Sequence, residues 1–249
     1  MTDSLIIHGI INEMIDKVEQ TNKNDILHRV IRRSDDLTKS IYINRYYFTT
    51  LFICIIVFYM KQKTSSLYKN VYLFTNLIGS YVCMIIWGWY IHFISHNISF
   101  TEIYTYLLDN THNWIDKMIL FIFKYTIDFH DLVHHNTSVN KYYVFLIIEC
   151  IQNIVSQGLW FFLFNIDKVI NKYIILLWVC TYASVHLINY NISYIKNCHK
   201  EHHINYKTNY GIDYMDIIMG TKYDTKEIEN INHYSINLIV ITIILYIWG

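Results

Sequence analysis

The chain has 249 residues, of which 53% are hydrophobic and only 16% are charged, whereas a soluble domain usually carries about 25% charged residues. Twenty basic residues balance twenty acidic ones, so the charge gives no indication of a nucleic-acid partner. The five cysteines are scattered, and four of them fall inside apolar segments, which favours reduced thiols over a disulfide framework.

Taken in chain order, the apolar segments predict an all-α integral membrane protein. Residues 4–18 show helical spacing of apolar and charged residues, as in an amphipathic helix. Four longer segments follow, at 41–60, 71–91, 142–165 and 173–191, each close to the roughly 20 residues that a bilayer requires. Short links join them pairwise, which predicts about four transmembrane helices in two hairpins. Shorter apolar runs at 118–127 and 236–248 are expected to lie at the interface or to pack under the polar end.

The chain shows no internal repeat and no flexible linker, so we expect one domain, residues 1–249. Within it we distinguish an amphipathic N-terminal region (1–40), a transmembrane core (41–221) and a C-terminal apolar tail (222–249). Basic residues precede the first span and follow the fourth. The excess of lysine and arginine on the cytoplasmic side of membrane proteins therefore places both termini in the cytoplasm.

Three histidine boxes stand where long apolar segments end. They read His92-Phe-Ile-Ser-His96, His130-Asp-Leu-Val-His134-His135 and His199-Lys-Glu-His202-His203. Histidines three or four residues apart share a helix face, and imidazole is the commonest protein ligand for iron, zinc and copper. The boxes therefore predict a metal centre in a helical cap on the cytoplasmic side.

The second box has an irregular spacing. On a regular helix His135 would lie about 140° from His130, so we expect either a widened π-helical turn there or one histidine that is not a ligand. Elsewhere, His186 lies near the end of the last span, where polar groups are costly, and is expected to be a ligand. His112 lies among polar residues typical of a capping loop and is not expected to be a ligand. Because a continuous helix would hold His186 too far from His199, we expect the helix to break at Asn189–Ser193.

These boxes, with the Asn209-Tyr210-Gly211, Asp216 and Gly220-Thr221 tail, resemble the fatty acid hydroxylase and sterol desaturase superfamily of membrane enzymes. The likeness covers about 71–221. It implies a di-iron centre held by nine histidines (92, 96, 130, 134, 135, 186, 199, 202 and 203), with zinc as a possible substitute and no catalytic residue beyond the ligands. Asp131, Glu201, Asp213 and Asp216 are candidates for orienting the histidines.

The resemblance also implies an activity. It is O₂-dependent hydroxylation of a lipid, either a fatty acyl chain or a sterol, in the endoplasmic reticulum or an equivalent internal membrane, with the boxes facing the cytoplasm. Electrons would come from an external cytochrome b5 or ferredoxin-type donor. The alternatives are a lipid desaturase with the same centre and a non-catalytic metal-binding membrane protein.

The chain departs from the family pattern at four places. The second box has one extra residue, segment 97–129 holds an inserted element, segment 211–216 is short, and Tyr190 stands where hydroxylases often have a second histidine in the last span. These departures leave the number of ligands open.

Overall fold

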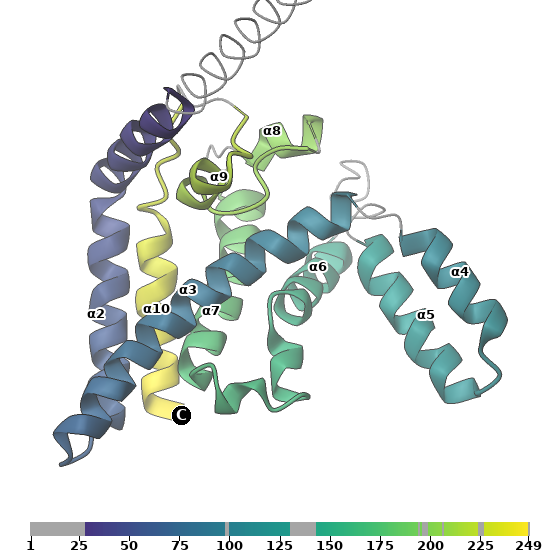
Figure 1. Cartoon of the computed structure of the whole chain (residues 1–249), viewed down its shortest axis with the longest axis horizontal. Helices are drawn as coiled ribbons and strands as arrows, with labels where there is room; N and C mark the ends of the chain where they lie inside the picture. The colour runs from purple at the N-terminus through teal and green to yellow at the C-terminus, as the bar shows by residue number, and fades with distance from the viewer. Residues whose placement is uncertain are drawn as a thin grey trace, which may run out of the picture.

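The computed structural model describes residues 28–97, 100–129, 143–193, 195, 199–205, 207–223 and 227–248. Within these ranges the chain is helical, with no β-strand, so the predicted all-α class is confirmed there. A first helix, His28–Ile43, precedes the labelled ones. In chain order these are α2 (Arg45–Gln62), α3 (Leu67–Asn97), α4 (Phe100–Asn110), α5 (Trp114–Phe129), α6 (Tyr143–Ser156), α7 (Lys172–Ser184), α8 (His199–Ile204), α9 (Asp213–Met219) and α10 (Tyr234–Trp248) (Figure 1).

Two of the described helices are long and apolar enough to cross a membrane, namely Leu67–Asn97 and Lys172–Ile192. A third qualifies only if the first helix and α2, which are bent by 71° at their junction, count as one span. The number is therefore two or three, where the sequence predicted about four. At about 1.5 Å per residue, the 31 residues of α3 exceed the roughly 30 Å hydrocarbon core, so one end of α3 can extend beyond it.

The predicted span at 142–165 is wrong as a single helix. Helix α6 ends at Ser156, and the chain continues through turns and two short 3-10 helices, Leu159–Phe162 and Ile166–Lys168. The cause is local. Gly158 has φ 136°, a conformation that excludes a helix and suits glycine. Apolar composition alone did not reveal this break.

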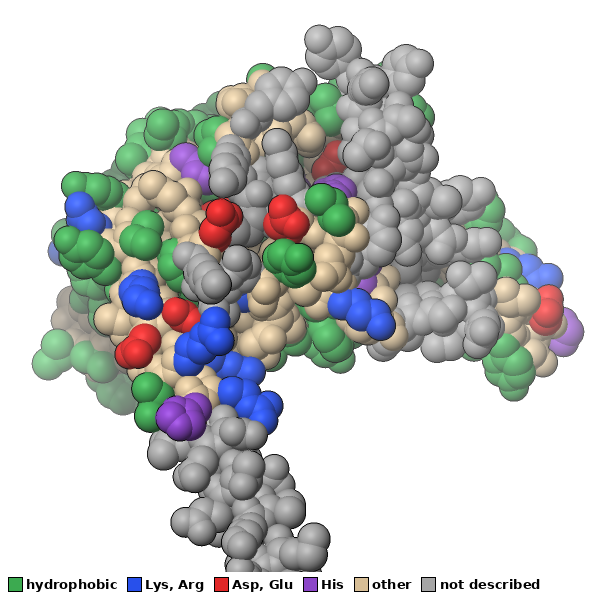
Figure 2. Space-filling model, turned by 90° about the horizontal axis from the view of Figure 1, so that it is seen from above, with side chains coloured by type: hydrophobic (Ala, Val, Ile, Leu, Met, Phe, Trp, Pro, Cys, Tyr) green, Lys and Arg blue, Asp and Glu red, His purple; other side chains and the backbone are tan. Residues whose placement is uncertain are grey.

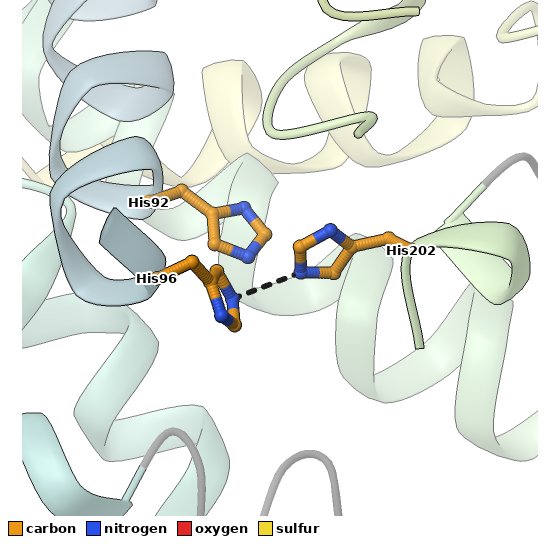
Figure 3. A group of neighbouring side chains, drawn as sticks. All are labelled: His92, His96 and His202. Atoms are coloured by element: carbon orange, nitrogen blue, oxygen red, sulfur yellow. Dashed lines mark hydrogen bonds between the residues drawn. The ribbon is translucent and has the colours of Figure 1, made fainter. Parts of the chain in front are cut away.

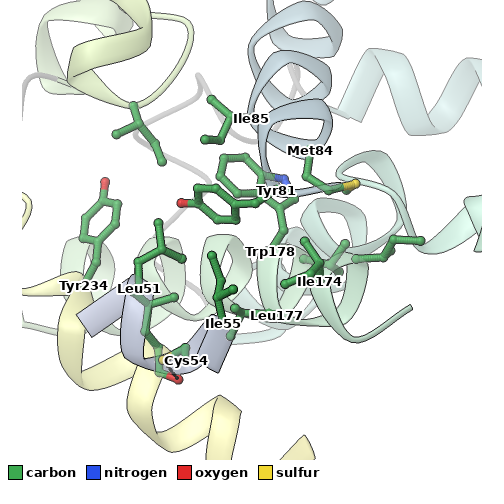
Figure 4. Packing of buried hydrophobic residues seen from close by; sticks show 14 of the residues in the cluster. Leu51, Cys54, Ile55, Tyr81, Met84, Ile85, Ile174, Leu177, Trp178 and Tyr234 are labelled. Atoms are coloured by element: carbon green, nitrogen blue, oxygen red, sulfur yellow. Dashed lines mark hydrogen bonds between the residues drawn. The ribbon is translucent and has the colours of Figure 1, made fainter. Parts of the chain in front are cut away.

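The core lies where α2, α3, α7 and α10 meet. Figure 4 shows Leu51 and Ile55 of α2 on the same side of the cluster as the Tyr81 ring of α3 and Leu177 of α7. Met84 and Leu177 are completely buried. Gly88 allows α3 to approach Trp178 of α7 closely, because a Cβ at position 88 would lie 2.5 Å from Trp178 Cζ2 and 2.7 Å from Gln157 Oε1.

Helix α2 packs on α3 and helix α6 packs on α7, the two pairs that the sequence predicted. As a transmembrane hairpin the second pair is not as predicted, because α6 has only 14 residues and is not among the helices long enough to cross a membrane. The C-terminal tail, α10, packs against α2 and α7, so it belongs to the bundle. Its residues Tyr234 and Leu238 also line a cavity beside His92. Residues 100–129 form the α4–α5 hairpin, which stands apart from the bundle (Figure 1).

Candidate metal centre

Three histidines from two distant segments meet at one end of the bundle. His92 and His96 come from the last turns of α3, and His202 comes from α8; their side chains point toward one another (Figure 3). One ring nitrogen from each lies within 4.8 Å of the others. His92 and His202 are buried and His96 is half-buried. Of the groups of histidine, cysteine and acidic residues in the described chain, this is the one that could hold a metal ion.

Local structure explains how the two segments meet. His92 and His96 are four residues apart on one helix, so they share a face. The last span ends as a π-helix at Ile192, and Ser193 N–H donates to the Ile188 carbonyl at 2.8 Å. Of the predicted break at Asn189–Ser193, residues 189–192 are still helical and only Ser193 lies beyond the helix. A separate helix, α8, then carries His202 to α3.

Backbone carbonyls orient two of the three rings. His92 Nδ1 lies 2.7 Å from the Tyr210 carbonyl oxygen, and His202 Nδ1 lies 2.6 Å from the Thr208 carbonyl oxygen. A carbonyl only accepts, so each Nδ1 carries the proton and donates it. In the neutral ring, Nε2 then presents a lone pair. Metal-binding histidines are commonly fixed in this way.

The third contact, between His202 and His96, fits either a proton or a cation shared by the two rings. His202 Nε2 lies 3.0 Å from His96 Nε2. Since the proton of neutral His202 is on Nδ1, this contact requires either a proton on His96 Nε2 or a cation bound by both lone pairs. Two nitrogens at right angles around one ion, each about 2.1 Å from it, lie about 3.0 Å apart. The residues present therefore fit a metal.

Asp216 holds the loop that supplies these carbonyls. Its carboxylate is buried and accepts from Tyr210 N–H and Gly211 N–H, both at 2.9 Å, and from the Thr221 hydroxyl at 2.6 Å. Burial raises the pKa of Asp216 to about 6, although these hydrogen bonds lower it. Asp216 thus acts on the histidines through the backbone of residues 208–210 and does not touch them.

The Asn209-Tyr210-Gly211 motif has a structural reason. Asn209 has φ 54°, in the left-handed region that asparagine tolerates better than most residues. Its side-chain oxygen accepts from Tyr223 N–H at 3.0 Å, and its own N–H donates to the Thr221 carbonyl at 2.9 Å. The tail motif therefore forms a rigid turn beneath the histidines. The sequence pattern of these residues did not indicate this role.

Trp89 is a further residue that the sequence did not single out. It lies on α3 one turn before His92 and stacks on Phe93, with ring centroids 5.0 Å apart. Its Nε1–H donates to the Thr221 hydroxyl at 3.1 Å. The indole therefore ties α3 to the Asp216 turn. A tryptophan in an apolar segment that also contains Trp87 carries no sequence signal for such a role.

The other candidate acids behave differently. Asp213 is buried and forms an ion pair with Lys222; it also accepts from the Ser40 hydroxyl at 3.1 Å and from Glu229 N–H at 3.2 Å. These bonds tie the first helix to α9, and none of them involves the three histidines. Glu201 is exposed. Asp131 lies outside the described residues.

His186 lies in the π-helix Val185–Ile192, buried between Tyr182 and Tyr190. The ring centroids are 4.5 Å apart for His186 and Tyr182, and 5.3 Å apart for His186 and Tyr190. His186 and His92 line the same internal cavity of about 40 Å³, which is large enough for about two or three waters. The structure does not bring His186 into the group of His92, His96 and His202.

The remaining sequence candidates are placed as follows. His203 is half-buried, with its ring 6.1 Å from that of His202. His199 begins α8, but its side chain lies outside the described part of the chain. All of the second box (His130, His134 and His135), with the widened turn predicted there, lies outside it too. His112 is exposed in the link between α4 and α5, beside Asn113, whose side chain accepts from Ile115 N–H at 3.0 Å.

Comparisons of the chain with protein-family models, with curated proteins and with solved structures gave no match.

Proposed function

We propose that the protein is a membrane-bound di-iron oxygenase that hydroxylates a lipid, either a fatty acyl chain or a sterol, with O₂ and electrons from an external cytochrome b5 or ferredoxin-type donor. The observation that carries this proposal is the meeting of His92, His96 and His202 at the end of helices apolar enough to cross a membrane. The three histidines come from the first and third boxes of the motif set that resembles the hydroxylase superfamily.

Residues His92, His96 and His202 would hold part of the metal centre. The proposal adds His130, His134, His135, His186, His199 and His203 as further ligands. Bound iron would supply the O₂ binding and C–H oxidation that amino-acid side chains cannot perform. The surrounding residues keep the rings in place. The Thr208 and Tyr210 carbonyls fix the two buried rings. The Tyr210 ring packs on His92, and Trp89 and Phe93 pack on Tyr210.

The outer surface of α3 supports a lipid environment. Ile78, Val82, Ile86 and Tyr90 recur every fourth residue, so they lie along one face, and each is 40–48% exposed. An exposed apolar stripe of this kind marks a membrane or partner contact. It runs along the helix that carries His92 and His96. A bilayer lipid would therefore lie alongside the proposed centre, and we place the protein in the endoplasmic reticulum or an equivalent membrane with this end facing the cytoplasm.

A second candidate is a non-catalytic membrane protein that binds one zinc ion. It is favoured by the number of imidazoles in the described cluster, because three protein ligands are a common set for one zinc. A lipid desaturase would use the same centre as the hydroxylase, and the products separate these two.

The experiment is to express the chain with iron supplementation, purify it from membranes and measure metal per chain, O₂ consumption with a reductase system, and oxidised lipids in the host. The proposal expects two irons, O₂ consumption and a hydroxylated lipid. His202→Ala should remove all three signals. His112→Ala is the matched control, an exposed histidine outside the cluster, and should leave them intact. One tightly held zinc without O₂ consumption would overturn the oxygenase in favour of the metal-binding scaffold.

A further inference from the structure

Four apolar side chains of the first helix, His28–Ile43, are exposed: Val30 58%, Ile31 49%, Ile41 48% and Tyr42 70%. Leu37 of the same helix is half-buried and packs against the hydrophobic core. The fully buried side chains of this helix, Asp36 and Ser40, are polar. At about 100° per residue, the exposed apolar residues occupy one face. In water such a face would be unfavourable, so an apolar medium is the surrounding that fits it.

The opposite face of the helix packs on the protein through polar contacts. Asp36 and Ser40 are buried there, and Ser40 donates to Asp213 of α9 at 3.1 Å. At the junction with α2, Asn44 is also buried; its side chain donates to the Glu229 carbonyl at 2.9 Å and accepts from Ile231 N–H at 2.8 Å. The helix is therefore fixed in orientation, and its apolar face is held outward.

The angle of this helix suits a membrane surface. It meets α2 at a bend of 71°, with Asn44 between them. If α2 runs along the bilayer normal, the first helix lies close to the bilayer plane. It also lies at the end of the bundle that carries α8 and α9 (Figure 1).

A basic cavity opens between this helix and α9. Its volume is about 310 Å³, within the range of small-ligand sites. The lining residues are Arg29, Arg32, Arg33, Asp36, Asp216, Ile217, Gly220, Lys222 and Tyr223. Basic side chains gather at this end of the molecule, beside the point where the described chain begins (Figure 2).

The charges in this cavity favour an anion. Asp36 lies 4.0 Å from Arg32, and Lys222 is paired with Asp213. The lining carries four basic side chains, Arg29, Arg32, Arg33 and Lys222, against two acidic ones, Asp36 and Asp216. Gly220 makes room for one of them, because a Cβ at Gly220 would overlap the Arg33 guanidinium. Arginine forms paired hydrogen bonds with phosphate oxygens, which makes it well suited to phosphate recognition.

We propose that the first helix lies in the plane of the membrane surface and that this cavity binds the phosphate group of an anionic phospholipid. The inference rests on the membrane location in the proposed function and does not depend on the oxygenase reaction. A lipid fits better than free phosphate because the exposed apolar face of the same helix contacts the acyl region while its arginines reach the headgroup level.

The test is lipid retention by the purified full-length chain. The protein is released from mixed micelles that contain equal amounts of phosphatidylcholine and phosphatidate, and native mass spectrometry counts the lipids that remain bound. We expect about one phosphatidate per chain and little phosphatidylcholine. In the variant with Arg29→Gln and Arg33→Gln, phosphatidate affinity should fall about tenfold or more, since each basic residue near a membrane surface contributes severalfold.

Arg45→Gln is the matched control. Arg45 is an exposed arginine just beyond the bend, its guanidinium donates to the Tyr42 carbonyl at 3.2 Å, and it does not line the cavity. It should retain phosphatidate as the parent does. Arg33→Lys keeps the positive charge, and its size-exclusion profile shows whether the protein is folded. If this lysine variant retains phosphatidate, the loss in the glutamine variant reflects the missing charge and not misfolding, which supports the site.

Three outcomes would overturn the inference. They are equal retention of both lipids, equal loss in the Arg45 control, or displacement of phosphatidate by millimolar inorganic phosphate, which would indicate a site for free phosphate. Metal content measured on the same samples keeps the two proposals separate. Phosphatidate retained by a chain without metal would refute the oxygenase and leave the lipid site standing.

Discussion

Replacing Asp216 by asparagine tests the link between the tail motif and the histidines. The carboxylate accepts three hydrogen bonds, from Tyr210 N–H, Gly211 N–H and the Thr221 hydroxyl. Asparagine has one acceptor oxygen, and its NH₂ group would face a donor. We expect the turn to shift, and with it the Tyr210 carbonyl that accepts from His92. Changes in groups that orient metal ligands typically lower metal affinity by about 10–100-fold.

The same substitution has a calculable effect on stability against pH. The pKa of Asp216 is raised from 3.8 to about 6, so the folded state binds the proton more tightly than the unfolded state does. The stabilisation from this proton is complete below about pH 3.8 and is lost as pH rises through 6. A rise of this size corresponds to about 3 kcal/mol. Asparagine does not titrate, so the stability of the parent relative to the variant should fall by about 3 kcal/mol between pH 3.8 and 7.

Both effects are measurable with one set of proteins. Chelator competition gives metal affinity at neutral pH, and thermal unfolding of the metal-free protein between pH 4 and 7 gives the pH dependence without metal ligation. Asp109→Asn is the control, because Asp109 is exposed on α4, away from the cluster. Identical pH slopes for parent and Asp216→Asn would refute the raised pKa. Unchanged metal affinity would refute the positioning role of the turn.

Gly88→Ala should destabilise the protein by about 1–3 kcal/mol through overpacking, because its Cβ would collide with Trp178 and Gln157. Gly79→Ala on the same helix has nothing within 4 Å and should be neutral or stabilising, and a similar loss in both would contradict the packing argument. His202→Ala and His203→Ala are each expected to remove bound metal, measured per chain by elemental analysis; retained stoichiometry in either counts against that ligand. A glycosylation acceptor placed near Asn205 should stay unmodified in the endoplasmic reticulum if the boxes face the cytoplasm, and its modification would reverse the topology.

Apolar runs and residue spacing within short stretches of the sequence were sufficient to predict much of the fold. A charge-free apolar run predicted the helix that became α3, and an i,i+4 spacing predicted that His92 and His96 share a face. Both properties depend on residues within a few turns of one another. The helix end at Ser193 was also within the predicted range, because serine competes for backbone hydrogen bonds, although Asn189 and Asn191 lie inside the π-helix Val185–Ile192.

Other features depended on backbone conformation that composition does not encode. The apolar segment 142–165 satisfied the length criterion for a span, yet Gly158 adopts φ 136° and ends the helix. The orientation of His28–Ile43 is a second case. Periodicity can identify its two faces, but it cannot determine which one packs on the protein until Ser40 is found bonded to Asp213.

The sequence by itself therefore determined the helical class, the apolar segments and the histidines available for metal binding. Only the tertiary structure decided that His202 meets His92 and His96, and that the Thr208 and Tyr210 carbonyls fix two of these rings. The physical reason is that helix periodicity arises from hydrogen bonds between residues close in the chain, whereas the histidine cluster joins groups more than 100 residues apart, and its geometry depends on how α3, α8 and the Asp216 turn pack together.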